Sequence, residues 1–159
     1  MQSTEVYLAH LAHLVSLILY IGSLVVWLRS LVKGGRGSDP SVAFGLASLG
    51  VLIHVYALIV FTSSYHQLPL TGIGPSLSSL ALVIGLALLG TIVFGEGRRV
   101  GIVVIPVMIF LETVAVVLGV EPSFEVMDFQ GAWFSLHVMM AFVGFGGMTL
   151  SFAASSLYV

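Results

Sequence analysis

Residues 100–120 of the chain read VGIVVIPVMIFLETVAVVLGV, and this run is the clearest indication of what kind of protein it is. Glu112 is the only charged residue in the run. A helix rises about 1.5 Å per residue, so a helical run of this length covers the roughly 30 Å of hydrocarbon in a bilayer. We therefore interpret residues 100–120 as a transmembrane helix.

Four more apolar segments lie to either side of it, separated by short stretches that hold nearly all the charges and most of the prolines. Hydrophobic residues make up 58% of the chain and charged residues 8%, whereas a soluble domain carries roughly a quarter charged residues. The sequence predicts an all-α integral membrane bundle in contact with the lipid bilayer. We expect a single domain of five transmembrane helices over about residues 7–32, 42–63, 77–94, 100–120 and 131–159.

The basic residues predict the orientation of this bundle. All the arginines and the lysine fall near two of the connections between predicted helices. One connection joins the first helix to the second, and the other joins the third helix to the fourth. Cytoplasmic loops of membrane proteins carry an excess of Lys and Arg. We therefore predict that the N-terminus lies outside and the C-terminus inside (N-out/C-in). The residues are Arg29, Lys33, Arg36, Arg98 and Arg99.

Several functional classes find no support in the sequence. The chain has no cysteine, which excludes disulfides, thiolate metal ligands and covalent haem attachment. It contains no nucleophile–base pair, phosphate-binding loop or metal-ligand cluster with a specific spacing. The formal net charge of −2 gives no indication of a nucleic-acid partner. We expect neither nucleic-acid binding nor enzymatic turnover.

Two histidines inside the predicted helices are the strongest candidates for a site. His54 lies about 13 Å and His137 about 10 Å below the outer ends of their helices, at 1.5 Å per residue. Two imidazoles at one depth on different helices are what a haem b needs as axial ligands. The alternative is that each histidine only forms a hydrogen bond to a neighbouring helix. Because ionisable groups in a membrane are costly, a functional role is a serious possibility.

Glu112 is the only carboxylate inside a predicted span, and it lies near the level of His54. Buried in hydrocarbon, it must be protonated or paired. It is therefore a candidate for orienting a histidine that binds a cofactor, or for relaying a proton. Alternatively, a protonated Glu112 only joins two helices.

Further candidates lie at the outer end of the bundle. His66 belongs to a loop, residues 63–70, that either closes over a ligand or only connects two helices. Trp133 either stacks on the edge of a porphyrin or belongs to an interfacial aromatic belt. His10 and His13 are three residues apart on one helical face, and we expect them to be solvated at the interface.

The order of these features resembles the cytochrome c assembly proteins, the CcsA/CcmC group and in particular its YpjD/HemX-like branch. The resemblance extends over essentially the whole chain but covers only the N-terminal helices usual for the family. It rests on short segments in the same order: residues 19–29 with Trp27, GVLIHVY at 50–56, residues 75–89, VGIVVIPVM at 100–108 and GAWFSLHVMMAFVG at 131–144.

This resemblance implies haem handling at the outer face of a prokaryotic cytoplasmic membrane in support of cytochrome c maturation. It implies apocytochrome c or a haem-delivery partner as interacting proteins. By position, His137 is similar to the family's external haem ligand, and His54 to a second-helix histidine. The family's WGxxWxWD signature is absent, so we expect that the chain is a fragment or that a partner supplies further helices.

Two other functions stay open at this point. The chain could be an anchor or accessory subunit of a respiratory oxidoreductase that binds haem b or quinone, with His54 and His137 holding the haem. It could also be a structural subunit without a cofactor, associated with other membrane subunits.

Overall fold

The structure is a computed structural model that describes residues 2–32, 40–94, 100–122 and 131–157. These residues form five helices and no strand, and every helix is long and apolar enough to cross a membrane. The predicted all-α membrane bundle is confirmed. In chain order the helices are α1 (Gln2–Val32), α2 (Pro40–Tyr65), α3 (Ile73–Phe94), α4 (Gly101–Leu118) and α5 (Ala132–Leu157).

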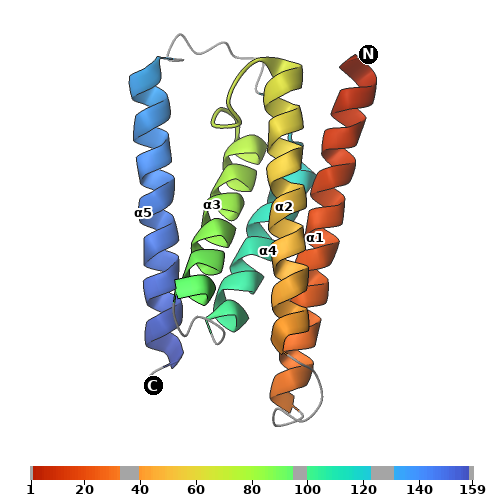
Figure 1. The fold of residues 1–159 in the computed structure, drawn as a ribbon. Coiled ribbons are helices and arrows are strands. Elements are labelled where there is room, and N and C mark those ends of the chain that lie inside the picture. The colour runs from red at the N-terminus through yellow and green to blue at the C-terminus, as the bar shows by residue number, and fades with distance from the viewer. Residues whose placement is uncertain (1, 33–39, 95–99, 123–130, 158–159) are drawn as a thin grey trace.

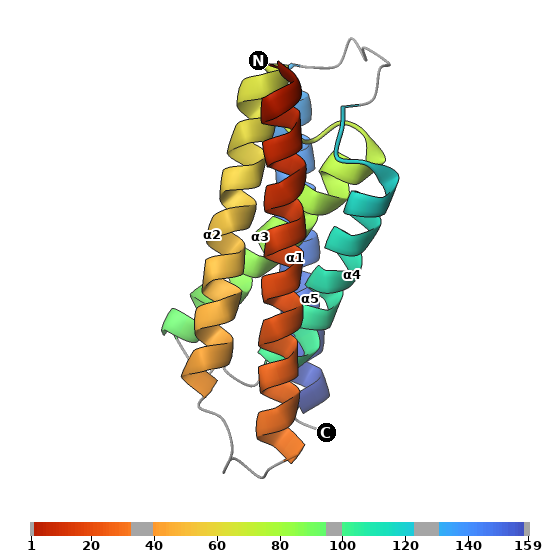
Figure 2. The ribbon, with the colours of Figure 1, turned by 90° about the vertical axis from the view of Figure 1, so that its right-hand side faces the viewer.

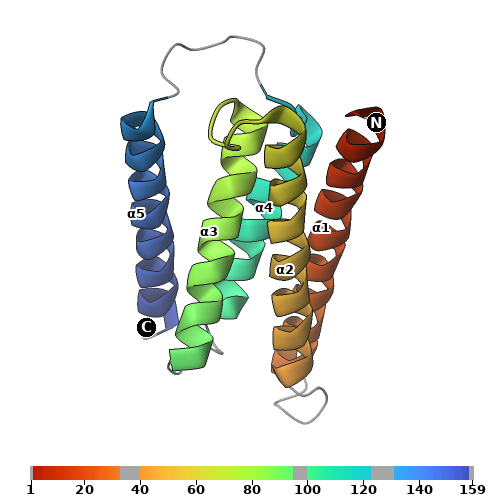
Figure 3. The same ribbon diagram turned by 45° about the horizontal axis from the view of Figure 1, so that its top comes forward.

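The first four helices form the body of the bundle, and α5 lies at its edge. Helices α1 and α2 pack along each other, α3 packs against α4, and α1 also contacts α4. Helix α5 rests mainly on α3 and, among the described residues, does not contact α1 or α2. Figures 1 and 3 show α5 beside α3 and farthest from α1, and Figure 2 shows α1 with α2 on one side and α4 on the other.

The bundle buries polar and small side chains and exposes large aliphatic ones. Ser16, Ser23 and Ser78 are fully buried, whereas Ile18 and Ile59 are at least 60% exposed. Lipid provides no hydrophobic drive for helix pairing, so small residues and interhelical hydrogen bonds hold the helices together. The Ser23 hydroxyl, for example, donates to the Ala43 carbonyl across α1 and α2 at 2.7 Å.

Two helix starts differ from the prediction. Helix α3 begins at Ile73, four residues before the expected residue 77, because Pro75 lies in its first turn rather than in the preceding loop. Proline is tolerated there, where its missing N–H would have no helical acceptor. Helix α1 begins at Gln2 instead of near Tyr7, so the polar residues before Tyr7 are helical too. The last two residues of the predicted fifth helix lie outside the described residues.

The N-terminus and the C-terminus lie at opposite ends of the bundle, as a chain with five membrane-spanning helices requires (Figure 1). The C-terminal ends of α1, α3 and α5 lie at one end of the bundle, and the N-terminus lies at the other (Figure 1). Arg29 is exposed in the last turn of α1. Lys33, Arg36, Arg98 and Arg99 lie outside the described residues, so the compartment on each side stays a prediction from the charges.

Single cysteines test this orientation, since the chain has none of its own. We expect a membrane-impermeant maleimide to label a Thr4→Cys variant in intact cells. A Ser38→Cys variant, in the connection that carries basic residues, should be labelled only after permeabilisation. The reverse pattern would show that the bundle is inserted N-in.

Glycines allow a few very close approaches between helices. A Cβ on Gly74 in α3 would overlap the carbonyl oxygen of Gly119 after α4, and a Cβ on Gly50 in α2 would approach the Tyr20 ring of α1 to 2.7 Å. A Cβ on Gly90 of α3 would meet nothing within 4 Å. Backbone cannot yield as a flexible side chain can, so the Gly74 contact is the stricter of the two.

We therefore predict that Gly74→Ala lowers the stability of the bundle by about 1–3 kcal/mol, the usual cost of overpacking. Gly90→Ala in the same helix should be neutral or stabilising by up to about 1 kcal/mol, because alanine favours helix over glycine. Thermal unfolding in detergent, monitored by size-exclusion chromatography, compares the melting temperatures of the two variants. Equal melting temperatures would contradict the close contact between α3 and α4.

Candidate functional site

Three chemically reactive side chains from three helices meet in the core of the bundle. His13 comes from α1, His54 from α2 and Glu112 from α4, and each is fully buried. Each helix brings its residue inward because the residue continues that helix's buried stripe. On α4, for example, Glu112 lies one helical turn beyond Met108 and one before Ala115, both of which are fully buried. The fully buried Ser78 of α3 completes the cluster.

The polar atoms of this cluster lie within hydrogen-bonding distance of one another. His13 Nδ1 is 2.8 Å from Glu112 Oε1, and His54 Nε2 is 2.7 Å from Ser78 Oγ. Ser78 Oγ is also 3.3 Å from His13 Nδ1. The ligand atoms that His13, His54 and Glu112 offer lie within 4.8 Å of one another. Four helices are thus joined through one polar centre.

Tyr20 holds the second ring nitrogen of His54. Its hydroxyl is 3.1 Å from His54 Nδ1, and the Tyr20 side chain is itself fully buried. The close approach of Gly50 to the Tyr20 ring fixes where that ring lies. The imidazole of His13 meets that of His54 edge-on, with ring centroids 5.4 Å apart. His54 therefore has a protein partner at each ring nitrogen.

Two buried polar atoms of the cluster lack a hydrogen-bond partner among the described residues. They are Glu112 Oε2 and His13 Nε2. Glu112 Oε2 is 3.3 Å from His54 Nε2, close enough for an ionic attraction but without the alignment of a hydrogen bond. Buried polar groups in proteins are nearly always paired. The cluster thus has the capacity to bind one more group.

The chemistry open to this arrangement is proton exchange or cation binding. The proton between His13 Nδ1 and Glu112 Oε1 belongs to either partner, which makes the pair an acid and base in contact. Histidine nitrogens with a carboxylate also form a common ligand set for first-row transition metals. An unpaired charge would be costly here, so every proton or ion that enters must be balanced within the cluster.

The structure brings together only part of the predicted site. His54 and Glu112 lie at one level in contact range, as their matched depth predicts. His137 is exposed on α5, and Trp133 is 84% exposed one turn before it. Because His54 directs both ring nitrogens to partners on α1 and α3, and α2 does not contact α5, the geometry does not support a haem held between His54 and His137.

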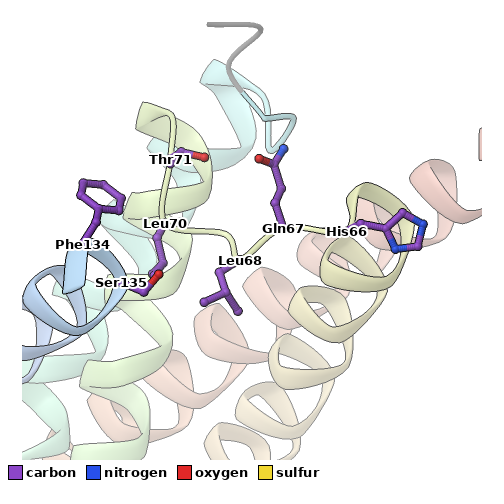
Figure 4. A pocket seen from close by; sticks show the side chains of 7 residues that line it. All are labelled: His66, Gln67, Leu68, Leu70, Thr71, Phe134 and Ser135. Atoms are coloured by element: carbon purple, nitrogen blue, oxygen red, sulfur yellow. The ribbon is translucent and has the colours of Figure 1, made fainter. Parts of the chain in front are cut away.

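His66 lies at the end of α2, with a backbone φ of 53°, on the rim of a cavity of about 210 Å³. The side chains of Phe134 and Ser135 from the start of α5 line the same cavity. Figure 4 shows the His66 ring pointing away from both of them. The loop therefore reaches α5, but the imidazole of His66 is exposed and is not part of the buried cluster.

Sequence reasoning missed His13, which we expected to be solvated at the interface. It is buried, and it lies on the same face of α1 as Ser16, Tyr20, Ser23 and Trp27. These residues recur every three or four positions, which is the spacing of one helical face. In a membrane helix a stripe of polar and aromatic residues faces the protein interior, so this spacing was the signal that could have identified His13.

Comparison with known proteins identifies no relative. No family model matches the chain, and no curated protein or solved structure matches it. The resemblance to cytochrome c assembly proteins therefore stays a prediction from the order of the segments.

The buried cluster predicts a strong dependence of stability on Glu112. A Glu112→Ala variant leaves two buried imidazoles without their carboxylate partner, and we expect a loss of at least about 2 kcal/mol. Glu121→Ala, at an exposed position just after the same helix, should change stability by less than about 0.5 kcal/mol. Thermal unfolding of the two variants in detergent measures the difference. Equal melting temperatures would show that Glu112 is not paired in the core.

Proposed function

We propose that this multi-pass membrane protein handles haem in the manner of the cytochrome c assembly proteins, without catalytic turnover of its own. One observation carries the proposal. His137 is an imidazole within the apolar helix α5, exposed on the surface of the bundle and without a hydrogen-bond partner among the described residues. An imidazole that neither pairs nor faces water is costly in hydrocarbon, and coordination of an external metal centre resolves this cost.

The surface around His137 suits a flat apolar ligand. Trp133, Met140 and Gly144 lie four residues before, three after and seven after His137, on one face of α5. Trp133 and Met140 are 84% and 64% exposed, and a Cβ on Gly144 would meet nothing within 4 Å. A macrocycle bound through His137 would have Trp133 beside it toward the N-terminal end of α5. Met140 and the open Gly144 would lie beside it toward the C-terminal end.

Helix α5 also has room for a partner. Only 17% of its apolar window is buried in the bundle, against 33–39% for the other four helices. Apolar surface left open to this degree favours contact with other membrane subunits or with further helices, in addition to lipid.

The single imidazole favours haem handling over electron transfer. A haem b in a respiratory anchor subunit is held firmly by two axial histidines, and here His54 is not free to be the second. A haem held by His137 alone on an open face exchanges readily, which is what delivery to apocytochrome c or to a haem-delivery partner requires. In this role the haem would be cargo, and Trp133 and Met140 would orient it. The placement in a prokaryotic cytoplasmic membrane belongs to the same proposal.

Haemin titration of the purified protein tests the proposal. We expect a shifted Soret band on binding, and His137→Ala should weaken binding by at least roughly tenfold, or about 1.4 kcal/mol. His10→Ala is the matched control, a histidine at the outer end of the bundle but away from α5, and should bind like the unchanged protein. Absence of a Soret shift, or equal affinity of the His137→Ala variant, would contradict the proposal.

The anchor-subunit alternative predicts a different result. A haem b would then co-purify without exchange and together with a soluble dehydrogenase. Both His137→Ala and His54→Ala would remove it. Under our proposal a folded His54→Ala variant keeps its affinity for haemin.

A further inference from the structure

We propose that the buried cluster of His13, His54, Glu112 and Ser78 is a binding site for a divalent transition-metal cation, with Zn²⁺ as the best match. This site lies in the core between α1, α2, α3 and α4 and is separate from the exposed face of α5 that carries His137. The proposal does not depend on haem binding. It rests on the donor set, the distances and an unpartnered carboxylate oxygen.

The distances already approach those of a tetrahedral metal site. With metal–ligand bonds of about 2.0–2.1 Å, the ligand atoms of a tetrahedral zinc site lie roughly 3.3 Å apart. His54 Nε2 is 3.3 Å from Glu112 Oε2, and Ser78 Oγ is 3.3 Å from His13 Nδ1. Two other separations, His13 Nδ1 to Glu112 Oε1 and His54 Nε2 to Ser78 Oγ, are 2.8 and 2.7 Å. They are hydrogen-bonding distances that would open by about 0.5 Å when a cation replaces the shared proton.

The unpartnered atom Glu112 Oε2 independently indicates a missing ligand. It is fully buried, carries lone pairs and has no hydrogen-bond donor among the described residues. A protein group left in this state costs about 1–3 kcal/mol, and more when it is charged. A cation between Glu112 and the two histidines would satisfy it from the side that already faces His54 Nε2.

Tyr20 is placed to support the tautomer of His54 that a metal requires. A neutral imidazole that coordinates through Nε2 must carry its hydrogen on Nδ1, and a second group usually accepts that N–H. The Tyr20 hydroxyl oxygen, 3.1 Å from His54 Nδ1, is placed to accept it. Tyr20 is thus a positioning residue that would leave the lone pair of Nε2 directed at the cluster.

A cavity lies near the N-terminal end of α1, on the same side of the bundle as the end of α2. It measures about 280 Å³ and is lined by residues of α1, by Tyr65 at the end of α2 and by Glu121 just after α4. His10 in its wall lies one helical turn before His13 on α1. The wall of this cavity thus carries an imidazole one helical turn along α1 from the cluster.

The donor types favour a borderline divalent ion. Two neutral imidazoles and one carboxylate reduce a divalent cation to a net charge of about +1, the same magnitude as the empty cluster with an ionised Glu112. The set contains no thiolate, which disfavours Cu⁺, and too few oxygens for Mg²⁺ or Ca²⁺. Because four protein atoms surround the centre and all are buried, the cation would join four helices rather than activate a substrate.

Metal titration of the purified, tag-free protein after chelator treatment tests this site. We expect stoichiometric Zn²⁺ binding, a rise in melting temperature through mass action, and intense visible absorption when Co²⁺ replaces Zn²⁺ in a tetrahedral site. His13→Ala and Glu112→Gln should abolish the Co²⁺ spectrum. Tyr20→Phe should keep the site but weaken Zn²⁺ binding by about 10–100-fold, as the loss of an orienting hydrogen bond does.

His137→Ala is the matched control, and it should bind Zn²⁺ like the unchanged protein. Glu112→Gln keeps the volume of the side chain, so it provides a folded ligand variant if His13→Ala does not fold. The proposal is overturned if the unchanged protein binds neither Zn²⁺ nor Co²⁺, or if a folded Glu112→Gln variant gives the same Co²⁺ spectrum. Loss of haem affinity in His137→Ala with retained Zn²⁺ binding would separate the two sites.

Discussion

The hydrogen bond between His13 and Glu112 is the interaction on which the rest of the bundle depends. It joins α1 to α4, two helices that are far apart in the chain, through atoms 2.8 Å apart that no solvent reaches. In hydrocarbon each of these groups alone would be strongly unfavourable, so each is tolerated only because the other is present. His54 and Ser78 pack against this pair, with Ser78 Oγ 3.3 Å from His13 Nδ1 and His54 Nε2 3.3 Å from Glu112 Oε2, and Tyr20 in turn contacts His54. A polar centre of this kind fixes the positions of four otherwise apolar helices relative to one another.

The arrangement separates the molecule into two structural parts. The core of α1 to α4 is closed, and its polar atoms are directed at one another. Helix α5 lies outside this core, and its histidine has no partner among the described residues. We therefore assign different roles to histidines that looked equivalent by depth. His54 belongs to the inner centre, while His137 faces lipid or a partner.

The fold followed from hydropathy because the membrane imposes strong rules on length and charge. Residues 100–120 with one carboxylate could hardly be anything but a spanning helix, and α4 occupies Gly101–Leu118 within that range. The depth of Glu112 relative to His54 could also be predicted from the sequence, since it is set by the helical rise alone. The rotation of each helix about its own axis could not be predicted in this way. His54 and His137 were expected at a similar depth but lie in different surroundings, and only the packing of α5 against α3 decides that. His13 was missed because its distance from the end of α1 was considered and the polar stripe on its helix was not.

The pairing of His13 with Glu112 is most directly tested by a double-mutant cycle on the stability of the protein in detergent. The single variants His13→Ala and Glu112→Ala and the double variant would be unfolded by titration with a denaturing detergent. If the two side chains are partners in the core, their effects are not additive, and the coupling energy lies between about 0.5 and 3 kcal/mol. Additive effects, with a coupling energy within about 0.3 kcal/mol of zero, would show that the two residues do not meet and would contradict the buried centre described above.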